Sequence, residues 1–276
     1  MLSPKPGLVC PCSSGSHSDM DWVTFITGAA ALTPFWRIQA MDGLNLGHYK
    51  PLENIAERLR ETGLKMERAM YEATGGVNTH KGLIFAMSLL LGASGVVAGA
   101  VNLRDALPAE DILRTAGQMI APRAGRELDD IMRRGERGDA LSHGERIYFS
   151  HGIGGVRREA AKGFPSVEAA LGYLENAVNL GASYRDAALK ALLFLMLRCE
   201  DTNVIHRGGL DFWKGEYAAR VFEAELSFNP LEPADYEPIR VLDRLLIDRG
   251  VSPGGAADLL ACTLFIYRSK ISGNIK

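Results

Sequence analysis

The sequence has almost no net charge, few cysteines and no recognisable secretion signal. Each of these features argues against a class of protein. The net charge of −2 at pH 7 gives no general attraction to nucleic acids or to membrane surfaces. Four cysteines (Cys10, Cys12, Cys199 and Cys262) do not make a disulfide framework, so we expect a reducing cytoplasm. The first fifteen residues hold three prolines and no apolar segment of signal-peptide length.

Strand patterns and internal repeats are also missing, because alternation of apolar and polar residues never persists beyond a few positions. Apolar residues nevertheless make up 47% of 276 residues, which is enough for a full-sized core. We predict a single all-α catalytic domain over residues 1–276, a bundle of about ten helices. Residues 1–18, rich in proline, should form an extended arm, and the polar loops at helix ends should gather at one end of the bundle.

The uncharged segment 82–103 is the only stretch long enough to cross a membrane. Its serines and glycines lower its hydrophobicity, and small residues four apart, as at Gly95 and Gly99, allow close helix packing both in membranes and in soluble bundles. We favour a buried core helix. Elsewhere we expect a helix over 20–32 ended by Thr33-Pro34, a loop over 41–50, and a solvated helix face in the arginine-rich stretch 123–139.

A glycine-rich turn, residues 75–82, opens directly into that apolar helix. Lys81 and free backbone N–H groups at a helix start suit an anion, phosphate above all. The turn is not a Walker A loop, since His80 precedes the lysine, Gly82 follows it and no strand leads in. A plain helix–helix turn with a solvated lysine is the alternative.

Three further stretches carry groups suited to anion or metal binding. Lys5 stands between two prolines, and Asp19 and Asp21 open the first helix as helix-dipole partners or as oxygen ligands for Mg²⁺. Glycine-flanked arginines near 157 resemble a phosphate clamp or an ordinary loop. The run 199–209 combines acid, amide, imidazole and guanidinium groups at a helix end, which suits a site better than a core.

Five segments, in order along nearly the whole chain, resemble the triphosphoribosyl-dephospho-CoA synthases, which make the prosthetic-group precursor of citrate lyase or malonate decarboxylase. The segments are 3–9 with 15–21, 76–82, 156–160 with 163–165, 201–203 with 206–209, and 252–258. There are departures: Arg158 stands where the family usually has glycine, Cys10-Pro-Cys12 replaces a basic or Asn-containing stretch, and the family usually carries a helical stretch before the Pro-Lys-Pro segment.

The resemblance implies an all-α fold, dependence on Mg²⁺, and a reaction in which a ribose hydroxyl of 3-dephospho-CoA attacks the anomeric carbon of ATP while adenine leaves. It also implies that the product passes to a prosthetic-group transferase acting on an acyl carrier protein subunit. A homodimer is compatible with the apolar Gly/Ala helix surfaces, whereas we expect neither nucleic acid nor membrane as a partner. The sequence does not choose between the two pathways.

Candidate residues follow from what this reaction needs. The triphosphate must be neutralised, its Mg²⁺ needs carboxylates, the hydroxyl needs a base and adenine leaves more readily when protonated. For binding ATP and its triphosphate we predict Lys5, Gly76, Asn78, Thr79, Lys81, Arg157, Asn203 and Arg207; for metal Asp19, Asp21, Asp201 and Asp258; for acid–base catalysis Glu67, Glu159 and His80. We expect Lys81, Arg207 and Asp201 to surround one shared hollow.

Two other functions fit the same residues. Water could replace dephospho-CoA as the acceptor, giving a nucleoside or ADP-ribosyl hydrolase on a helical scaffold. Alternatively, the chain could bind nucleotides without catalysis, a hypothesis that rests only on the altered segment at Arg158.

Overall fold

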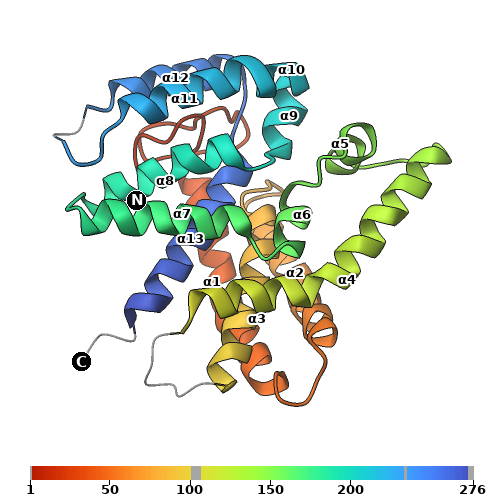
Figure 1. Ribbon diagram of the computed structural model, residues 1–276. Helices are drawn as coiled ribbons and strands as arrows, with labels where there is room; N and C mark the ends of the chain where they lie inside the picture. The colour runs from red at the N-terminus through yellow and green to blue at the C-terminus, as the bar shows by residue number, and fades with distance from the viewer. Residues whose placement is uncertain (1, 101–106, 233–234, 273–276) are drawn as a thin grey trace.

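Helices form the ordered framework of the computed structural model, which describes residues 2–100, 107–232 and 235–272 (Figure 1). Over these ranges no β-strand is present, only an isolated bridge between Cys10 and Ser13, and the all-α prediction is confirmed. The helices are α1 (Trp22–Leu46), α2 (Leu52–Ala73), α3 (Lys81–Ala100), α4 (Ala109–Glu136), α5 (His143–His151), α6 (Gly155–Ala161), α7 (Pro165–Asn179), α8 (Tyr184–Arg198), α9 (Thr202–Gly208), α10 (Leu210–Phe212), a π-helical turn (Trp213–Tyr217), α11 (Ala218–Ser227), α12 (Glu237–Asp248) and α13 (Gly254–Ser272).

The apolar helix α3 lies in the middle of the fold and packs against α1, α2, α4 and α13. It is the one helix of the described ranges long and apolar enough to cross a membrane, and 56% of its most apolar stretch is buried inside the protein. A Cβ atom built on Gly95 would lie 2.1 Å from the carbonyl oxygen of Ala40, and one on Gly43 would lie 2.0 Å from that of Gly92. Glycine therefore lets α1 and α3 cross with their backbones in contact, as expected for a core helix. Leu103, its expected end, lies outside the described residues.

Helix α1 is longer than predicted, because it continues through Pro34 to Leu46. The predicted stop at Thr33-Pro34 was therefore wrong, and the loop predicted over 41–50 is found only from residue 47 onward. Pro34 cannot donate to the carbonyl of Ala30, but both residues are exposed, so water can satisfy that carbonyl. Buried positions on the opposite face, Leu32 and Gln39, hold the helix against α2 and α3.

The C-terminal half is built around α8 and α13. Helix α8 is buried along most of its length and packs against α7, α11 and α13 (Figure 1). Residues 210–227 are helical without a break, and a π-helical turn at Trp213–Tyr217 connects α10 to α11. One continuous hydrophobic core, with members from Leu8 to Ile266, joins the two halves.

Residues 2–18, the described part of the N-terminal arm, contain no helix and are fixed to the C-terminal half. The Gly7 N–H donates to Asp243 Oδ1 over 2.8 Å, and the Ser16 hydroxyl donates to the carbonyl of Leu246 over 2.9 Å. Arg207 Nη1 donates to the carbonyls of Ser16 (3.1 Å) and Gly250 (3.2 Å). These bonds place the arm beside the start of α13.

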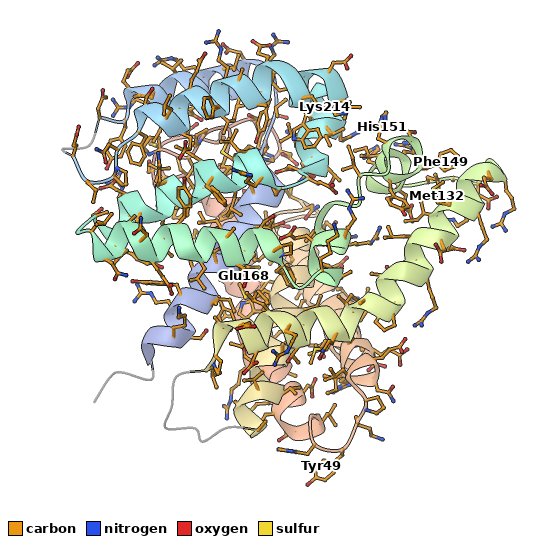
Figure 2. The ribbon with its side chains drawn as sticks, viewed as in Figure 1. Tyr49, Met132, Phe149, His151, Glu168 and Lys214 are labelled. Carbon is orange, nitrogen blue, oxygen red and sulfur yellow. The ribbon has the colours of Figure 1, made fainter. Side chains whose placement is uncertain are left out.

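The outer half of α4 projects from the body of the molecule and carries α5 (Figures 1 and 2). The ring of Phe149, on α5, covers Gly135 of α4 so closely that a Cβ there would lie 2.3 Å from it. Ser142 caps α5, and Glu145 accepts the N–H of Ser142 in return, which makes a capping box. The projection thereby forms a wall beside the cavity described next.

Candidate functional site

A cavity of about 460 Å³ lies between α2, α3, α4 and the beginning of α6. Its floor is apolar, with Leu59, Ile84, Phe85, Leu89, Ile120 and Ile131 among its members. Its rim is polar and carries Arg60, Glu67, Lys81, Arg123, Glu127, Arg157 and Thr202. A cavity of this size, apolar with a few convergent charges, is typical of a site for a nucleotide-sized ligand.

Lys81 begins α3 and reaches the cavity rim, where its Nζ lies 3.1 Å from Glu67 Oε2. The Lys81 side chain is 53% exposed, so its charge is open to a ligand. The Lys81 backbone N–H donates to the Asn78 side-chain oxygen over 3.1 Å, and Gly75 and Gly76 make the turn at φ 65° and 92°, values that favour glycine. The glycine-rich turn thus presents a lysine and a helix start to the cavity.

Asp258 lies behind that helix start, because a Cβ built on Gly82 would stand 2.1 Å from its Oδ2. Within the described residues this carboxylate makes no hydrogen bond or ion pair. Burial raises its pKa well above the usual 3.8, and the charge of Asp201 adds to the shift. Gly82 itself lines the cavity, so Asp258 stands one residue back from the rim.

Asp201 is 1% exposed and caps α9, accepting the N–H groups of Asn203 (3.0 Å) and Val204 (3.4 Å). Its other oxygen accepts the N–H of Ala256 in α13 over 3.0 Å. Burial raises the pKa of Asp201, and these N–H groups oppose the shift. Both carboxylate oxygens are therefore used in joining two helix starts. Asn203 lies against Gly254 at the same junction.

His80 is 6% exposed, and its ring packs against that of Phe25 with the ring centres 4.3 Å apart and the planes tilted by 39°, while Nδ1 lies 2.8 Å from Thr79 Oγ1. Burial, and then the nearby charge of Lys5, lower the pKa of His80 to about 4. The ring is therefore neutral near pH 7. Lys5 Nζ lies 5.4 Å from the centre of the same Phe25 ring, and burial lowers its pKa. These groups form a cluster beside the cavity rather than in its lining.

Arg157 and Glu159 belong to α6 but point to different surroundings. Arg157 lines the cavity, 3.7 Å from Glu127. Glu159 instead accepts the N–H (2.6 Å) and hydroxyl (3.1 Å) of Ser166 at the start of α7. Burial raises the pKa of Glu159, against the effect of those bonds, and the carboxylate is outside the cavity lining.

Three of the predicted residues are engaged at the N-terminal arm and α1. Asp21 caps α1 by accepting the N–H and hydroxyl of Thr24, each at 2.8 Å. Asp19 lies 3.4 Å from His17 and is 56% exposed. Arg207 holds the arm through its two carbonyl contacts. The shared hollow expected around Lys81, Arg207 and Asp201 thus receives Lys81 alone; Thr202, next to Asp201, also lines it.

Four residues of the cavity rim were not predicted as site residues from the sequence, namely Arg60, Arg123, Glu127 and Thr202. The interpretation of 123–139 as a solvated face was wrong at its beginning, where Arg123 is only 25% exposed. A signal was present, because Glu127 is seven residues after Ile120 and four before Ile131, on the apolar stripe of α4. A charged side chain on a buried stripe marks a lined cavity or a buried pair.

A comparison with known protein families matches nearly the whole chain to one of them. The model of the CitG family, described as ATP:dephospho-CoA triphosphoribosyl transferase, matches residues 1–275. A protein of Streptococcus equi subsp. equi, named "Probable 2-(5''-triphosphoribosyl)-3'-dephosphocoenzyme-A synthase", is 37% identical over 96% of this chain and 90% of its own length. A protein of Pectobacterium carotovorum subsp. carotovorum with the same name is 38% identical over 97% of this chain and 84% of its own.

A solved structure supports the fold. The crystal structure of an Archaeoglobus fulgidus protein, named as a candidate triphosphoribosyl-dephospho-CoA synthase, superimposes with a TM-score of 0.55. It covers 89% of this chain and 98% of the other at 18% identity, which shows a common fold.

Proposed function

The chain belongs to the CitG family of ATP:dephospho-CoA triphosphoribosyl transferases, and we propose that its transfer takes place in the cavity between α2, α3, α4 and α6. The observation that supports this location is the convergence of Lys81, Glu67 and Arg157 on one rim above an apolar floor. The floor suits the purine of ATP, and the rim suits its phosphates.

The bonds that change define what the residues must do. The ribose hydroxyl of 3-dephospho-CoA forms a C–O bond to the anomeric carbon of ATP, and the bond from that carbon to adenine breaks. The hydroxyl proton passes to a base, and adenine takes a proton as it leaves. The product carries the intact triphosphoribosyl group, so no phosphate bond is broken.

Lys81 and the N–H groups at the start of α3 would hold the triphosphate, since a lysine at a helix start is a natural anion site. Its partner Glu67 is half-buried on the same rim. When the triphosphate takes Lys81, Glu67 is released and becomes the best-placed base among the three predicted acid–base residues. His80 and Glu159 would act from outside the cavity lining, His80 as a neutral ring.

The aspartates fit Mg²⁺ only in part. No group of three or more His, Cys, Asp or Glu side chains suited to a metal occurs in the described part of the chain. Asp21 and Asp201 are occupied as helix caps, whereas Asp258 has no hydrogen bond or ion pair among the described residues. Mg²⁺ needs only one or two carboxylates when phosphates supply the rest. We propose that Asp258 is such a ligand, and that the ion, when bound, neutralises phosphate charge.

The proposal extends to the pathway, the cellular location and the oligomeric state of the protein. The product would supply a prosthetic group of citrate lyase or malonate decarboxylase, through a transferase acting on an acyl carrier protein subunit. A cytoplasmic location and a homodimer are likewise proposed, supported by the packed position of α3 and by exposed apolar residues of α1 such as Val23 and Ile26.

The reaction is tested by incubating the protein with ATP and Mg²⁺, with and without 3-dephospho-CoA, and weighing the products by mass spectrometry. We expect adenine to appear only when the acceptor is present, together with a product of the mass of dephospho-CoA plus the triphosphoribosyl group. Adenine release that ignores the acceptor would support the hydrolase alternative. No release at all would support the non-catalytic one.

A further inference from the structure

A second hollow, of about 550 Å³, adjoins the first, with which it shares lining residues. Its lining is almost entirely charged: four arginines, four acids and one isoleucine, namely Glu57, Arg123, Arg126, Glu127, Asp130, Ile131, Arg134, Glu145 and Arg157. Arg123, Glu127, Ile131 and Arg157 line both hollows, so they form the ridge between them. No apolar ligand is suited to such walls, but a phosphorylated one is.

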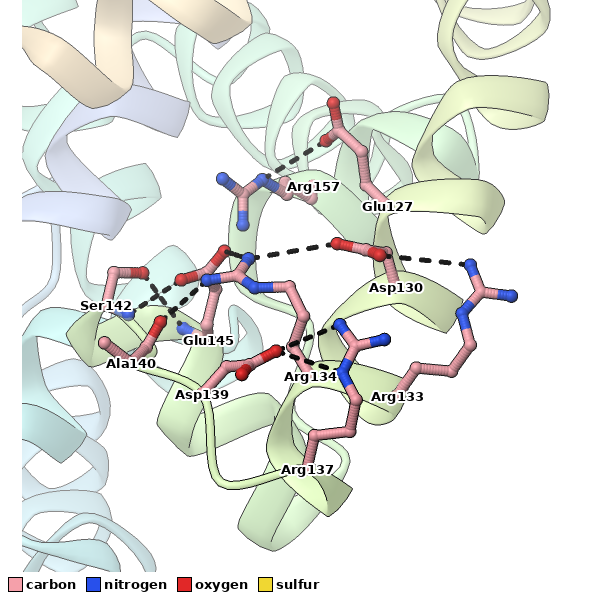
Figure 3. Close-up of polar contacts among 10 residues, drawn as sticks. All are labelled: Glu127, Asp130, Arg133, Arg134, Arg137, Asp139, Ala140, Ser142, Glu145 and Arg157. Carbon is pink, nitrogen blue, oxygen red and sulfur yellow. Dashed lines mark hydrogen bonds and ion pairs between the residues drawn. The ribbon is translucent and has the colours of Figure 1, made fainter.

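The charged side chains that line the second hollow differ in how firmly they are held (Figure 3). Arg134 is fixed by Glu145 at 3.0 Å and by the carbonyl of Ala140 at 2.7 Å. Glu145 is itself held in the capping box of α5. Arg157, by contrast, has only the 3.7 Å approach of Glu127 and makes no hydrogen bond within the described residues. Its guanidinium, 42% exposed, can exchange that weak contact for a ligand.

Glu127 occupies the position between two arginines that a phosphate would take. Its Oε1 accepts from Arg123 Nε over 2.7 Å, and its Oε2 faces Arg157. A phosphate offers more charge and more acceptor oxygens than one carboxylate, so it can replace Glu127 as the partner of both guanidinium groups.

The two substrates of the proposed function must bring reacting atoms within about 3.5 Å of each other while both carry phosphates that repel. Different helices supply separate cations to the lining of the first cavity: Lys81 belongs to α3, whereas Arg123 and Arg157 belong to α4 and α6. In dephospho-CoA the attacking ribose is joined directly to the diphosphate. A diphosphate on the ridge therefore leaves that ribose free to reach into the first cavity.

We propose that the ridge is the binding site for the diphosphate of the acceptor, with Arg157 and Arg123 as its cations and Glu127 as the carboxylate that it displaces. This inference rests on the proposed function and redirects Arg157 from ATP, to which the sequence had assigned it, to the second substrate. Glu127 keeps the arginines paired until the acceptor arrives.

The test separates the KM values of the two substrates. Arg157→Ala is expected to raise the KM for dephospho-CoA roughly tenfold or more, the effect of losing a charge-assisted contact, and to leave the KM for ATP within about twofold. Glu127→Gln is expected to lower the KM for dephospho-CoA by roughly threefold, because the arginines lose their internal competitor. Arg133→Ala is the matched control, since Arg133 is 64% exposed, lies 4.0 Å from Asp130 and lines neither hollow.

A rise in the KM for ATP in Arg157→Ala would return this arginine to the triphosphate and overturn the inference. Unchanged KM values for dephospho-CoA in both Arg157→Ala and Glu127→Gln would also overturn the inference. Should the wild type release no adenine, the proposed function fails, and equilibrium binding of dephospho-CoA to the wild type and to Arg157→Ala still decides whether the ridge binds it. Equal affinity in that comparison would contradict the ridge alone.

Discussion

Lys81 and His80 are neighbours in the chain but lie in different surroundings. Lys81 faces the cavity with its charge exposed, whereas His80 is buried between Phe25 and Thr79. The sequence indicated Lys81 as a candidate for anion binding because a glycine turn and a helix start are local features. It could not indicate that the histidine turns the other way, because Lys5 and Phe25, which surround it, come from distant parts of the chain.

The burial of His80 has a consequence for stability. Its pKa is about 4 in the folded protein against 6.5 when unfolded, so the unfolded chain binds the proton more tightly. The free energy of unfolding therefore falls as pH drops below 6.5, and the loss is complete once pH is below 4. Between pH 8 and pH 5 the wild type should lose about 2 kcal/mol more than His80→Asn in urea denaturation. Parallel pH profiles for the two proteins would show that His80 does not carry this effect.

Position 82 favours glycine because a side chain there would meet the carboxylate of Asp258. Gly82→Ala places a Cβ against Asp258 Oδ2 and forces that side chain to move. If Asp258 is a ligand of Mg²⁺, the variant should need roughly tenfold more Mg²⁺ for half-maximal adenine release, the loss of one charge-assisted contact. Gly144→Ala is the comparison, since Gly144 also lines the cavity but a Cβ at that position would meet no atom within 4 Å. Equal Mg²⁺ dependence in the two variants would remove Asp258 from the proposed ion site.

At the scale of elements, the contact of α1 with α3 depends on glycines. The small residues of α3 predicted a core helix, but Pro34 predicted too early an end for its partner α1, because the sequence does not show that Pro34 is exposed. A proline on a solvent-facing stripe costs a hydrogen bond that water replaces, whereas tertiary packing on the other face keeps the helix continuous. Local propensity alone therefore ended α1 too early.

Gly95→Ala tests this contact. Its Cβ would lie 2.1 Å from the Ala40 carbonyl and 2.6 Å from the Leu44 nitrogen, both backbone atoms that cannot rotate away. The free energy of unfolding should fall by roughly 1–3 kcal/mol. Gly125→Ala, at an exposed helical position with no atom within 4 Å, should instead raise it by about 0.5–1 kcal/mol. Similar urea midpoints for the two variants would contradict the close crossing.

For the whole molecule, the N-terminal arm joins regions that the sequence keeps far apart. The proline pattern predicted an extended arm, and the structure fixes it to α12 and the loop before α13 through Asp243, Leu246 and Arg207. These long-range bonds have no local signature. For the same reason the sequence assigned Arg207 and Asp201 to a ligand, although in the structure both join segments of the chain.

Arg207→Ala should loosen the arm. The loss of two bonds from one charged side chain is expected to increase protease cleavage within residues 2–18 roughly fivefold or more, while the rest of the chain stays folded. Arg240→Ala, an exposed arginine 3.9 Å from Glu237, serves as the control. Unchanged cleavage of the arm relative to this control would show that other contacts hold it.

The account as a whole depends on Lys81 holding the triphosphate at the cavity rim. The most direct measurement is kcat/KM for ATP, from adenine release in the presence of dephospho-CoA, in Lys81→Ala and in Lys65→Ala, an exposed lysine of α2 outside the cavity lining. We predict a loss of about a hundredfold or more for Lys81→Ala and no more than about twofold for Lys65→Ala. Equal kcat/KM in the two variants would contradict the location of the site.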